Sequence, residues 1–211
     1  LCSLSGMDRV FFCNSGAEAN EAAIKIARLY GHSRDIDSPA IVVMENSFHG
    51  RTMATLTATG NRKVQAGFEP LVQGFVRVPY DDLDAVRKVA ENSSNVAAVL
   101  VEPVQGEGGI NIPPADYLPG VRELCDRMGW LMILDEIQTG MGRTGRPFAY
   151  QHFDIRPDVM TVATFADIMK RLNQKMNGDD PDYYSPPDSA ELAAQYLLLY
   201  ELSLPYGLDL N

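Results

Sequence analysis

Short apolar runs separated by longer amphipathic segments dominate the first three quarters of the chain. Five runs of mainly apolar residues predict buried strands, at 40–44, 75–78, 96–101, 130–134 and 159–163. Between several of them, apolar residues recur at helical spacing, over 18–30, 82–91 and 117–128. Such alternation of strands and helices is typical of an α/β domain with a mostly parallel sheet.

The pattern changes after Ala163. Residues 164–211 hold eight acids and three bases, and only two of the 17 glycines. We predict two helices there, joined by a loop rich in Gly, Asp and Pro: 165–176 and 190–202. The chain is therefore expected to divide into an α/β part, residues 1–163, and a helical tail, residues 164–211, which packs weakly on the first part.

Length, charge and cysteine content narrow the possible functions. The 211 residues are enough for one domain or two small ones. A net charge of −10 argues against a nucleic-acid-binding protein with a broad basic face. Cys2, Cys13 and Cys125 lack metal-ligand spacing, so no metal site is expected. Their number and spacing fit a reducing compartment such as the cytoplasm.

No apolar run approaches the roughly 20 residues of a membrane span. The first residue, Leu1, suggests a fragment.

The apolar run that begins at Trp130 leads straight into two carboxylates. This pattern predicts a buried strand that stops at Asp135 or Glu136. Ligands bind at the carboxyl ends of the strands in open α/β sheets, so an acid there is a candidate for a ligand contact. A buried acid needs a partner, which could be a protonated heterocyclic nitrogen or a helix cap or salt bridge within the protein. This stretch alone leaves both interpretations open.

A helix start is predicted at residues 14–18. Ser15 and Glu18 have the spacing of a capping box, which alone would account for them. The segment also suits a phosphate group, because free N–H groups, a serine hydroxyl and the positive end of a helix all favour an anion. Gly16 would allow a ligand to approach closely.

Two further polar clusters follow strand-like runs. Phe48 and Arg51 could be ordinary core and surface residues, or Phe48 could stack on an aromatic ring while Arg51 binds a carboxylate. Glu102 and Glu107 flank a glycine-rich turn of a kind that is common in α/β proteins. Taken together, the polar clusters fit one small, phosphorylated, nitrogen-bearing ring.

Four stretches carry a resemblance to a known family: NSGAEANEAAIKIAR, SFHGRT, VEPVQGEGG and LDEIQTGMGRTG. With these in this order, residues from about 10 to 163 resemble the large-domain core of class III aminotransferases, which depend on pyridoxal 5'-phosphate (PLP). Within that family the acetylornithine enzymes are the most similar. The resemblance covers three quarters of the chain but well under half of a full-length member. It implies an α/β fold with the mostly parallel sheet of a fold type I large domain, truncated, with a helical C-terminal tail.

The resemblance also implies roles for individual residues. The cofactor-binding residues would be Ser15, Gly16 and Ala17 for the phosphate, Phe48 and Ile137 for the two faces of the ring, Asp135 for the protonated ring nitrogen and Gln138 for the ring hydroxyl. We expect Asp135, Ser15 and Phe48 to converge on one pocket at the carboxyl ends of the strands. Arg51 would bind the substrate carboxylate. Glu107 would be a gating acid that pairs with an arginine of the C-terminal domain.

The sequence departs from the family at residue 164. The Schiff-base lysine of the family follows the strand that reads PDVMTVA here, and Thr164 stands in its place. No catalytic residue is therefore expected in this chain. The tail instead resembles an extramembrane segment of RND-superfamily exporters. We expect a chimera with its seam near residues 163–164, and a divergent C-terminus of the same protein is the alternative.

The expected function is that of an aminotransferase fragment. The family member would transfer an amino group from acetylornithine, or a similar ω-amino donor, to 2-oxoglutarate. Ornithine, succinyldiaminopimelate and 4-aminobutyrate are alternative donors. The missing lysine makes this chain itself inactive and favours a second hypothesis, a non-catalytic PLP-binding or interaction protein. The tail alone would suggest an exporter fragment. Family members are homodimers, and most of their interface is missing here.

Overall fold

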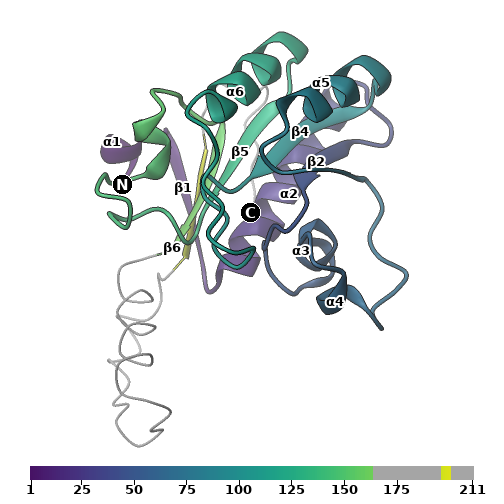
Figure 1. Cartoon of the computed structure of the whole chain (residues 1–211), viewed down its shortest axis with the longest axis horizontal. Helices are drawn as coiled ribbons and strands as arrows, with labels where there is room; N and C mark the ends of the chain where they lie inside the picture. The colour runs from purple at the N-terminus through teal and green to yellow at the C-terminus, as the bar shows by residue number, and fades with distance from the viewer. Residues whose placement is uncertain (164–195, 201–211) are drawn as a thin grey trace, which may run out of the picture.

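The computed structural model describes residues 1–163 and 196–200. Thr164 and the predicted helix 165–176 lie outside these residues. A seven-stranded sheet in the order β1-β7-β6-β5-β4-β2-β3 forms the centre of the described structure (Figure 1). Its strands are β1 (Arg9–Cys13), β2 (Ala40–Met44), β3 (Phe75–Val78), β4 (Val96–Val101), β5 (Leu131–Glu136), β6 (Val159–Ala163) and β7 (Tyr196–Tyr200).

The five predicted strands are all present, and they form one continuous parallel block from β6 to β3. Four of them have the predicted bounds, while β5 begins one residue later than expected and runs on to Glu136. Every residue of β2, β4, β5 and β6 is buried. Burial on both faces explains why these strands are continuous apolar runs rather than alternating ones.

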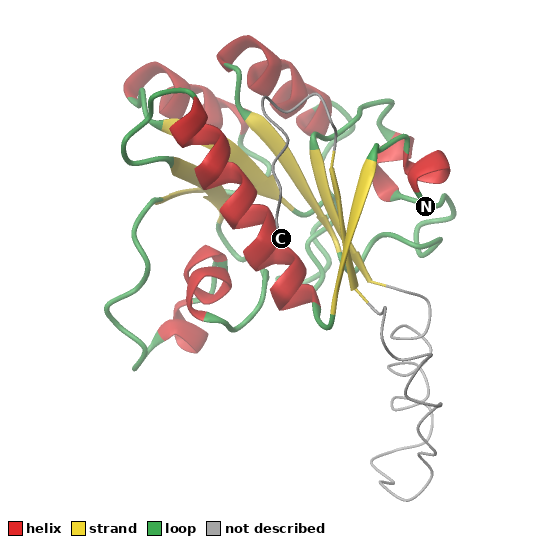
Figure 2. Ribbon diagram, turned by 180° about the vertical axis from the view of Figure 1, so that it is seen from behind, coloured by secondary structure: helices red, strands yellow, loops and turns green. Residues whose placement is uncertain are grey.

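Helices cover the two faces of the sheet. α2 (Gly16–Ser33) crosses one face, and α5 (Leu83–Asn92) and α6 (Tyr117–Met128) cover the other (Figures 1 and 2). Alternate residues of each strand therefore join different cores. In β2, Ile41 and Val43 pack in the α2 core, whereas Val42 and Met44 pack in the α5/α6 core.

Short elements lie in the connections: α1 (Cys2–Ser5), α3 (Met53–Ala58), α4 (Arg62–Gln65) and the 3-10 helix Ala149–His152. Backbone carbonyls at the C-terminal end of α3 accept hydrogen bonds from the side chains of Gln65 and Arg77. These contacts satisfy acceptors that a helix end leaves without an intrahelical partner. In the part of the chain that the structure describes, no helix has both the length and the apolar character needed to span a membrane.

The structure corrects the prediction of a helix over 190–202, because residues 196–200 form strand β7. This strand lies between β1 and β6 and runs antiparallel to both, with the backbone of Leu198 opposite Phe11 on one side and Thr161 on the other. The sequence YLLLY has no alternation that distinguishes helix from strand. Backbone pairing on both sides overrides local helix propensity here. These five residues of the tail therefore join the sheet, contrary to the expected weak packing.

Candidate functional site

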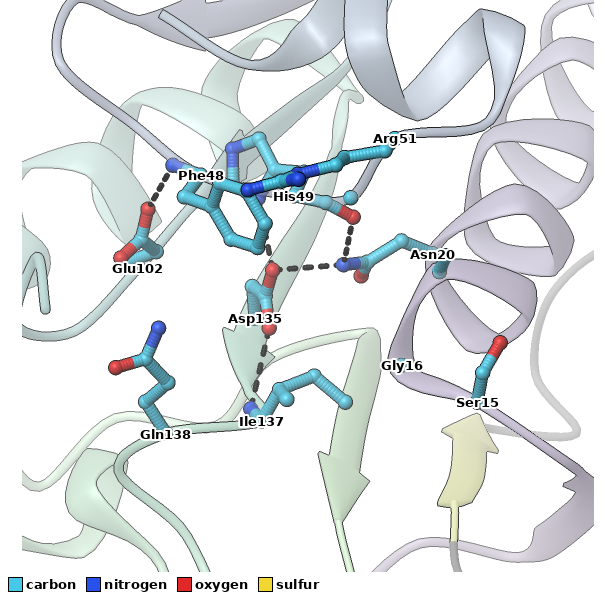
Figure 3. A pocket seen from close by; sticks show the side chains of 12 residues that line it. Ser15, Gly16, Asn20, Phe48, His49, Arg51, Glu102, Asp135, Ile137 and Gln138 are labelled. Atoms are coloured by element: carbon cyan, nitrogen blue, oxygen red, sulfur yellow. Dashed lines mark hydrogen bonds and ion pairs between the residues drawn. The ribbon is translucent and has the colours of Figure 1, made fainter. Parts of the chain in front are cut away.

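A pocket of about 280 Å³ lies at the carboxyl ends of β2, β4 and β5, beside the start of α2 (Figure 3). It is lined by Ser15, Gly16, Ala17, Asn20, Phe48, His49, Gly50, Arg51, Glu102, Asp135, Ile137 and Gln138. Every lining segment comes either from the first turns of α2 or from the end of a strand. The pocket is thus where an open parallel sheet is expected to bind a ligand.

The start of α2 forms one wall of the pocket. Ser15 is the N-cap residue, and its hydroxyl oxygen accepts a hydrogen bond of 3.1 Å from the N–H of Glu18. The Glu18 carboxylate in turn accepts a hydrogen bond of 2.7 Å from the N–H of Asn14. The serine half of the predicted capping box is therefore present, while Glu18 bonds the residue before the N-cap instead of Ser15 itself. The N-terminus of this 18-residue helix, with its positive dipole end and its first N–H groups, lies at the pocket. This favours an anion there.

Two glycines bring the walls of the pocket close together. A Cβ atom on Gly16 would lie 3.1 Å from the Cγ2 atom of Ile137. Gly50 has a φ of 133°, and a Cβ atom there would lie 2.6 Å from the Oγ1 atom of Thr55 and 2.9 Å from the Cβ atom of Ala17. Gly50 needs glycine, because its backbone conformation and both contacts exclude a side chain, whereas a Cβ atom on Gly16 would require the Ile137 side chain to shift by a few tenths of an ångström.

Asp135 lies at the base of the pocket, with 4% of its surface exposed. Its Oδ2 atom accepts hydrogen bonds from the Nδ2 atom of Asn20 and the Nδ1 atom of His49, both at 2.8 Å. Its Oδ1 atom accepts from the N–H of Ile137 at 3.1 Å and lies 3.2 Å from the Thr161 hydroxyl. A carboxylate only accepts hydrogen bonds, so this set of donors is matched to the ionised form.

The neighbouring acid, Glu136, has a different role. Its side chain is fully buried and accepts hydrogen bonds from the N–H groups of Ala149 and Tyr150, at 2.7 and 2.8 Å. Burial raises the pKa of Glu136 to about 7, and these donors limit the rise. Of the two acids at this strand end, Asp135 faces the pocket, while Glu136 fastens the loop that follows β5. Both acids have hydrogen-bond partners within the protein, and Asp135 alone also lines the pocket, where it stays a candidate for a ligand contact.

A second buried acid, Glu102, closes the pocket on the β4 side. Its carboxylate accepts hydrogen bonds from the N–H groups of Phe48 and Gly106, at 2.7 and 3.2 Å. Burial raises the pKa of Glu102 to about 7, and the nearby charge of Asp135 adds to the rise, while His49 opposes it. Glu102 therefore ties the loop that carries Phe48 to the glycine turn after β4.

The remaining side chains surround an open centre. Figure 3 shows Phe48 and Ile137 on opposite sides of Asp135, with Gln138 beside Ile137. The amide of Gln138 lies against the backbone of Gly106, where a Cβ atom would come within 2.1 Å of its Oε1 atom. An aromatic face, an aliphatic side chain and an amide thus border the space in front of the Asp135 carboxylate.

The structure places nearly all of the predicted site residues at this pocket. The predicted residues that line it are Ser15, Gly16, Ala17, Phe48, Arg51, Asp135, Ile137 and Gln138. Glu107 is exposed on the glycine turn and does not line the pocket. The expected convergence of Ser15, Phe48 and Asp135 is therefore observed.

Sequence reasoning did not assign a role to three polar residues around Asp135. Asn20 is a buried amide inside an alanine-rich helix, His49 lies within the SFHGRT stretch, and Thr161 interrupts the apolar run of β6. Each could be an ordinary core residue when taken singly. A polar residue inside an apolar segment that the fold buries was the only available signal.

Comparisons with known proteins agree with the fold. A family model described as aminotransferase class-III matches residues 1–166. The acetylornithine aminotransferase of Nitrosomonas europaea is 68% identical over 163 residues, which are 77% of this chain and 42% of that protein. Acetylornithine aminotransferase 1 of Bordetella parapertussis is 55% identical over 163 residues, with the same two coverages.

A solved structure shows the same architecture. The ornithine aminotransferase from Toxoplasma gondii superimposes with a TM-score of 0.78 at 33% sequence identity, covering 95% of this chain and 42% of that one. The chain thus spans about two fifths of the length of the curated relatives it matches. With the family model covering most of its length and the fold in agreement, this chain belongs to the class III aminotransferase family.

Proposed function

We propose that this chain supplies the cofactor-binding part of an aminotransferase that moves an amino group from acetylornithine, or a similar ω-amino donor, to 2-oxoglutarate. The observation that carries the proposal is the buried Asp135 carboxylate at the base of a pocket whose wall is a helix start. The choice of acetylornithine rests on the activity that gives the relatives their names. Because this chain spans only two fifths of those relatives, the proposed activity belongs to a complete protein of which this chain is a part.

Class III aminotransferases depend on PLP, and the chemistry of this pocket fits that cofactor. The start of α2 at Ser15 would hold the phosphate. The Asp135 carboxylate would accept the N–H of a protonated ring nitrogen, and Phe48 and Ile137 would hold the ring between them. Gln138 would bind the ring hydroxyl. When bound, PLP supplies an electron sink for the substrate carbon that loses its proton.

Two charged residues would act on the substrate. Arg51 lines the pocket with an exposed guanidinium group, which suits the carboxylate of an amino acid. Glu107 is exposed on the nearby glycine turn and would pair with an arginine from a part of the complete protein that this chain lacks. Both assignments place substrate recognition at the rim of the pocket rather than at its base.

This chain by itself is proposed to be inactive. None of the described residues that line the pocket is a lysine. Ala163, the last residue of β6, packs with Ala19 and Ile137 beside the pocket, and the next residue in sequence is Thr164. A threonine hydroxyl cannot form a Schiff base with the cofactor, so the covalent anchor and proton carrier of the reaction is missing.

A borohydride experiment tests this proposal. PLP added to the chain and reduced with borohydride should leave no stoichiometric pyridoxyl group on any one lysine, because none of the described residues that line the pocket is a lysine. The Thr164→Lys variant is the positive control and should trap the cofactor at position 164. Peptide mapping by mass spectrometry identifies the modified residue. A stoichiometric pyridoxyl group on one lysine of the unmodified chain, together with conversion of acetylornithine, would contradict the proposal.

The lack of a lysine among the described residues of the pocket also favours a second candidate for this chain on its own, a protein that binds PLP without catalysis. We propose, in addition, that residues 1–163 and 164–211 have separate origins. The family model supports this, because its match ends at residue 166. Genomic DNA read across codons 160–168 in independent long reads tests the seam. An uninterrupted reading frame in every read would make the junction genuine.

Assembly and location are further parts of the proposal. Phe12, Ile110 and Ile112 are large apolar residues with 52%, 74% and 71% of their surface exposed. Such exposed residues favour burial against a second subunit in the complete protein. No disulfide links the cysteines of the described residues, which favours a reducing compartment such as the cytoplasm.

A further inference from the structure

Both polar atoms of the Asn20 side chain have hydrogen-bond partners. Its Nδ2 atom donates one hydrogen bond to the carbonyl oxygen of His49 and one to the Oδ2 atom of Asp135, both at 2.8 Å. Its Oδ1 atom accepts a hydrogen bond of 2.9 Å from the Thr161 hydroxyl. A flipped amide would turn its oxygen toward a carbonyl and a carboxylate, so this network permits only one orientation. Asn20 thus presents a fixed N–H group to Asp135.

His49 presents a second fixed donor to the same oxygen. Its Nδ1 atom lies 2.8 Å from the Oδ2 atom of Asp135, and its side chain is fully buried. Its Nε2 atom is buried too and has no hydrogen-bond partner among the described residues. The Asp135 carboxylate only accepts hydrogen bonds, so the Nδ1 atom of His49 carries a proton and donates it to this contact. The backbone fixes the ring's position, since the N–H of His49 donates to the Thr59 hydroxyl at 2.9 Å.

The two carboxylate oxygens of Asp135 therefore differ in the hydrogen bonds that they accept. Oδ2 is held by two short contacts from Asn20 and His49. Oδ1 has one backbone donor, Ile137, and the Thr161 hydroxyl at 3.2 Å. That hydroxyl has a single proton and a nearer acceptor in Asn20. When Thr161 donates to Asn20, Oδ1 keeps a lone pair for a further donor.

We propose that Asn20 and His49 are positioning residues that hold the negative charge on Asp135, and that they thereby keep the shared proton on the ring nitrogen of the bound cofactor. This inference rests on the proposed function. The physical reason is that each donor to a carboxylate lowers its affinity for a proton. Without Asn20 or His49, Asp135 binds the proton more strongly, and the proton moves from the ring nitrogen to the carboxylate. A neutral ring is a poorer electron sink.

The test uses pyridoxamine phosphate labelled with ¹⁵N in its ring, since this probe needs no lysine to bind. Its ¹⁵N chemical shift, measured on the complex with the full chain, reports whether the ring nitrogen carries a proton. We expect the shift of a protonated ring nitrogen in the unmodified chain and of an unprotonated one in Asp135→Asn. The Asn20→Leu and His49→Leu variants should move the shift toward the unprotonated value and weaken binding by about tenfold.

A matched variant separates positioning from folding. His49→Asn keeps an N–H donor close to the position of Nδ1, so it should retain the protonated shift that His49→Leu loses. A purely structural role would lower the affinity of the Leu variants and leave the ¹⁵N shift of the bound probe unchanged. Circular dichroism identifies any variant that fails to fold. For the unmodified chain, ¹⁵N spectra of its three histidines report the site of the proton, and His49 should carry it on Nδ1.

The outcomes distinguish the two proposals. A protonated shift that persists in Asn20→Leu and His49→Leu, but is lost in Asp135→Asn, would overturn the positioning roles and leave the proposed cofactor site intact. A His49 ring that carries a proton on Nε2 and none on Nδ1 would overturn its assignment as a donor to Asp135. If the unmodified chain does not bind the probe, or if Asp135→Asn gives the same shift as the unmodified chain, the proposed function fails and this inference fails with it.

Discussion

Replacing Asp135 with asparagine should weaken the binding of PLP by roughly ten- to a hundredfold, which corresponds to one hydrogen bond to a charged group. The change keeps the shape of the side chain and removes its charge. It also places an amide opposite donors from Asn20, His49 and Ile137, so one N–H group must face another. We therefore expect the free energy of unfolding to fall by about 3 kcal/mol as well.

Fluorescence titration with PLP measures the first effect, and denaturant unfolding measures the second. Asp84→Asn is the matched control, because its carboxylate is 77% exposed and forms only a surface pair with Arg87. That change should alter neither quantity by more than about 0.5 kcal/mol. If Asp135→Asn binds PLP as tightly as the unmodified chain, Asp135 is not the partner of the ring nitrogen.

The Leu198→Pro variant should separate β1 from the rest of the sheet. The backbone of Leu198 is paired with both β1 and β6, and among the described strands β1 pairs only with β7. Proline removes an N–H group and is poorly tolerated in a central strand, at a cost of about 3 kcal/mol. β1 ends at Cys13, two residues before Ser15, so we also expect weaker binding of the PLP phosphate.

Hydrogen exchange is the measurement for this variant. Amides of residues 9–13 should lose protection, while those of β2 and β4 keep it because their partners are unchanged. Leu198→Val is the control, since it keeps the N–H group and favours a strand. Unchanged protection of β1 in Leu198→Pro would show that the tail does not hold this strand in place.

Four strands of the parallel block, β2, β4, β5 and β6, could be predicted from the sequence because burial on both faces leaves a mainly apolar run. In β4, all six residues are buried, and the apolar run has the same bounds as the strand. β1 was missed although residues 10–13 are also an apolar run, and in the structure Phe11 and Phe12 are exposed while Cys13 is buried. The short helices α3 and α4 were missed as well. They have only four to six residues, and the end of α3 is held by side-chain hydrogen bonds from Gln65 and Arg77, which come later in the sequence.

β7 was mispredicted for a different reason. A run of five apolar and aromatic residues is compatible with either helix or strand, and the choice is made by the backbone groups of β1 and β6. Those partners are more than thirty residues away in sequence, so no local pattern could identify them.

Local sequence patterns also decided which residues of the candidate site could be predicted. Ser15, Phe48 and Asp135, which line the pocket, lie in recognisable stretches of the sequence and could be predicted from them. Asn20, His49 and Thr161 act on Asp135 from three separate elements. Their contacts with Asp135 join positions that are far apart in the sequence, so no local pattern could identify them.

A crystal structure of the chain with pyridoxamine phosphate tests most directly whether this pocket is a cofactor site. We predict a phosphate at the N–H groups of Ser15, Gly16 and Ala17, a ring between Phe48 and Ile137, and a ring nitrogen within hydrogen-bonding distance of Asp135. The same structure would show Asn20 and His49 still bound to Oδ2. A ligand bound elsewhere, or one whose ring nitrogen points away from Asp135, would contradict the account.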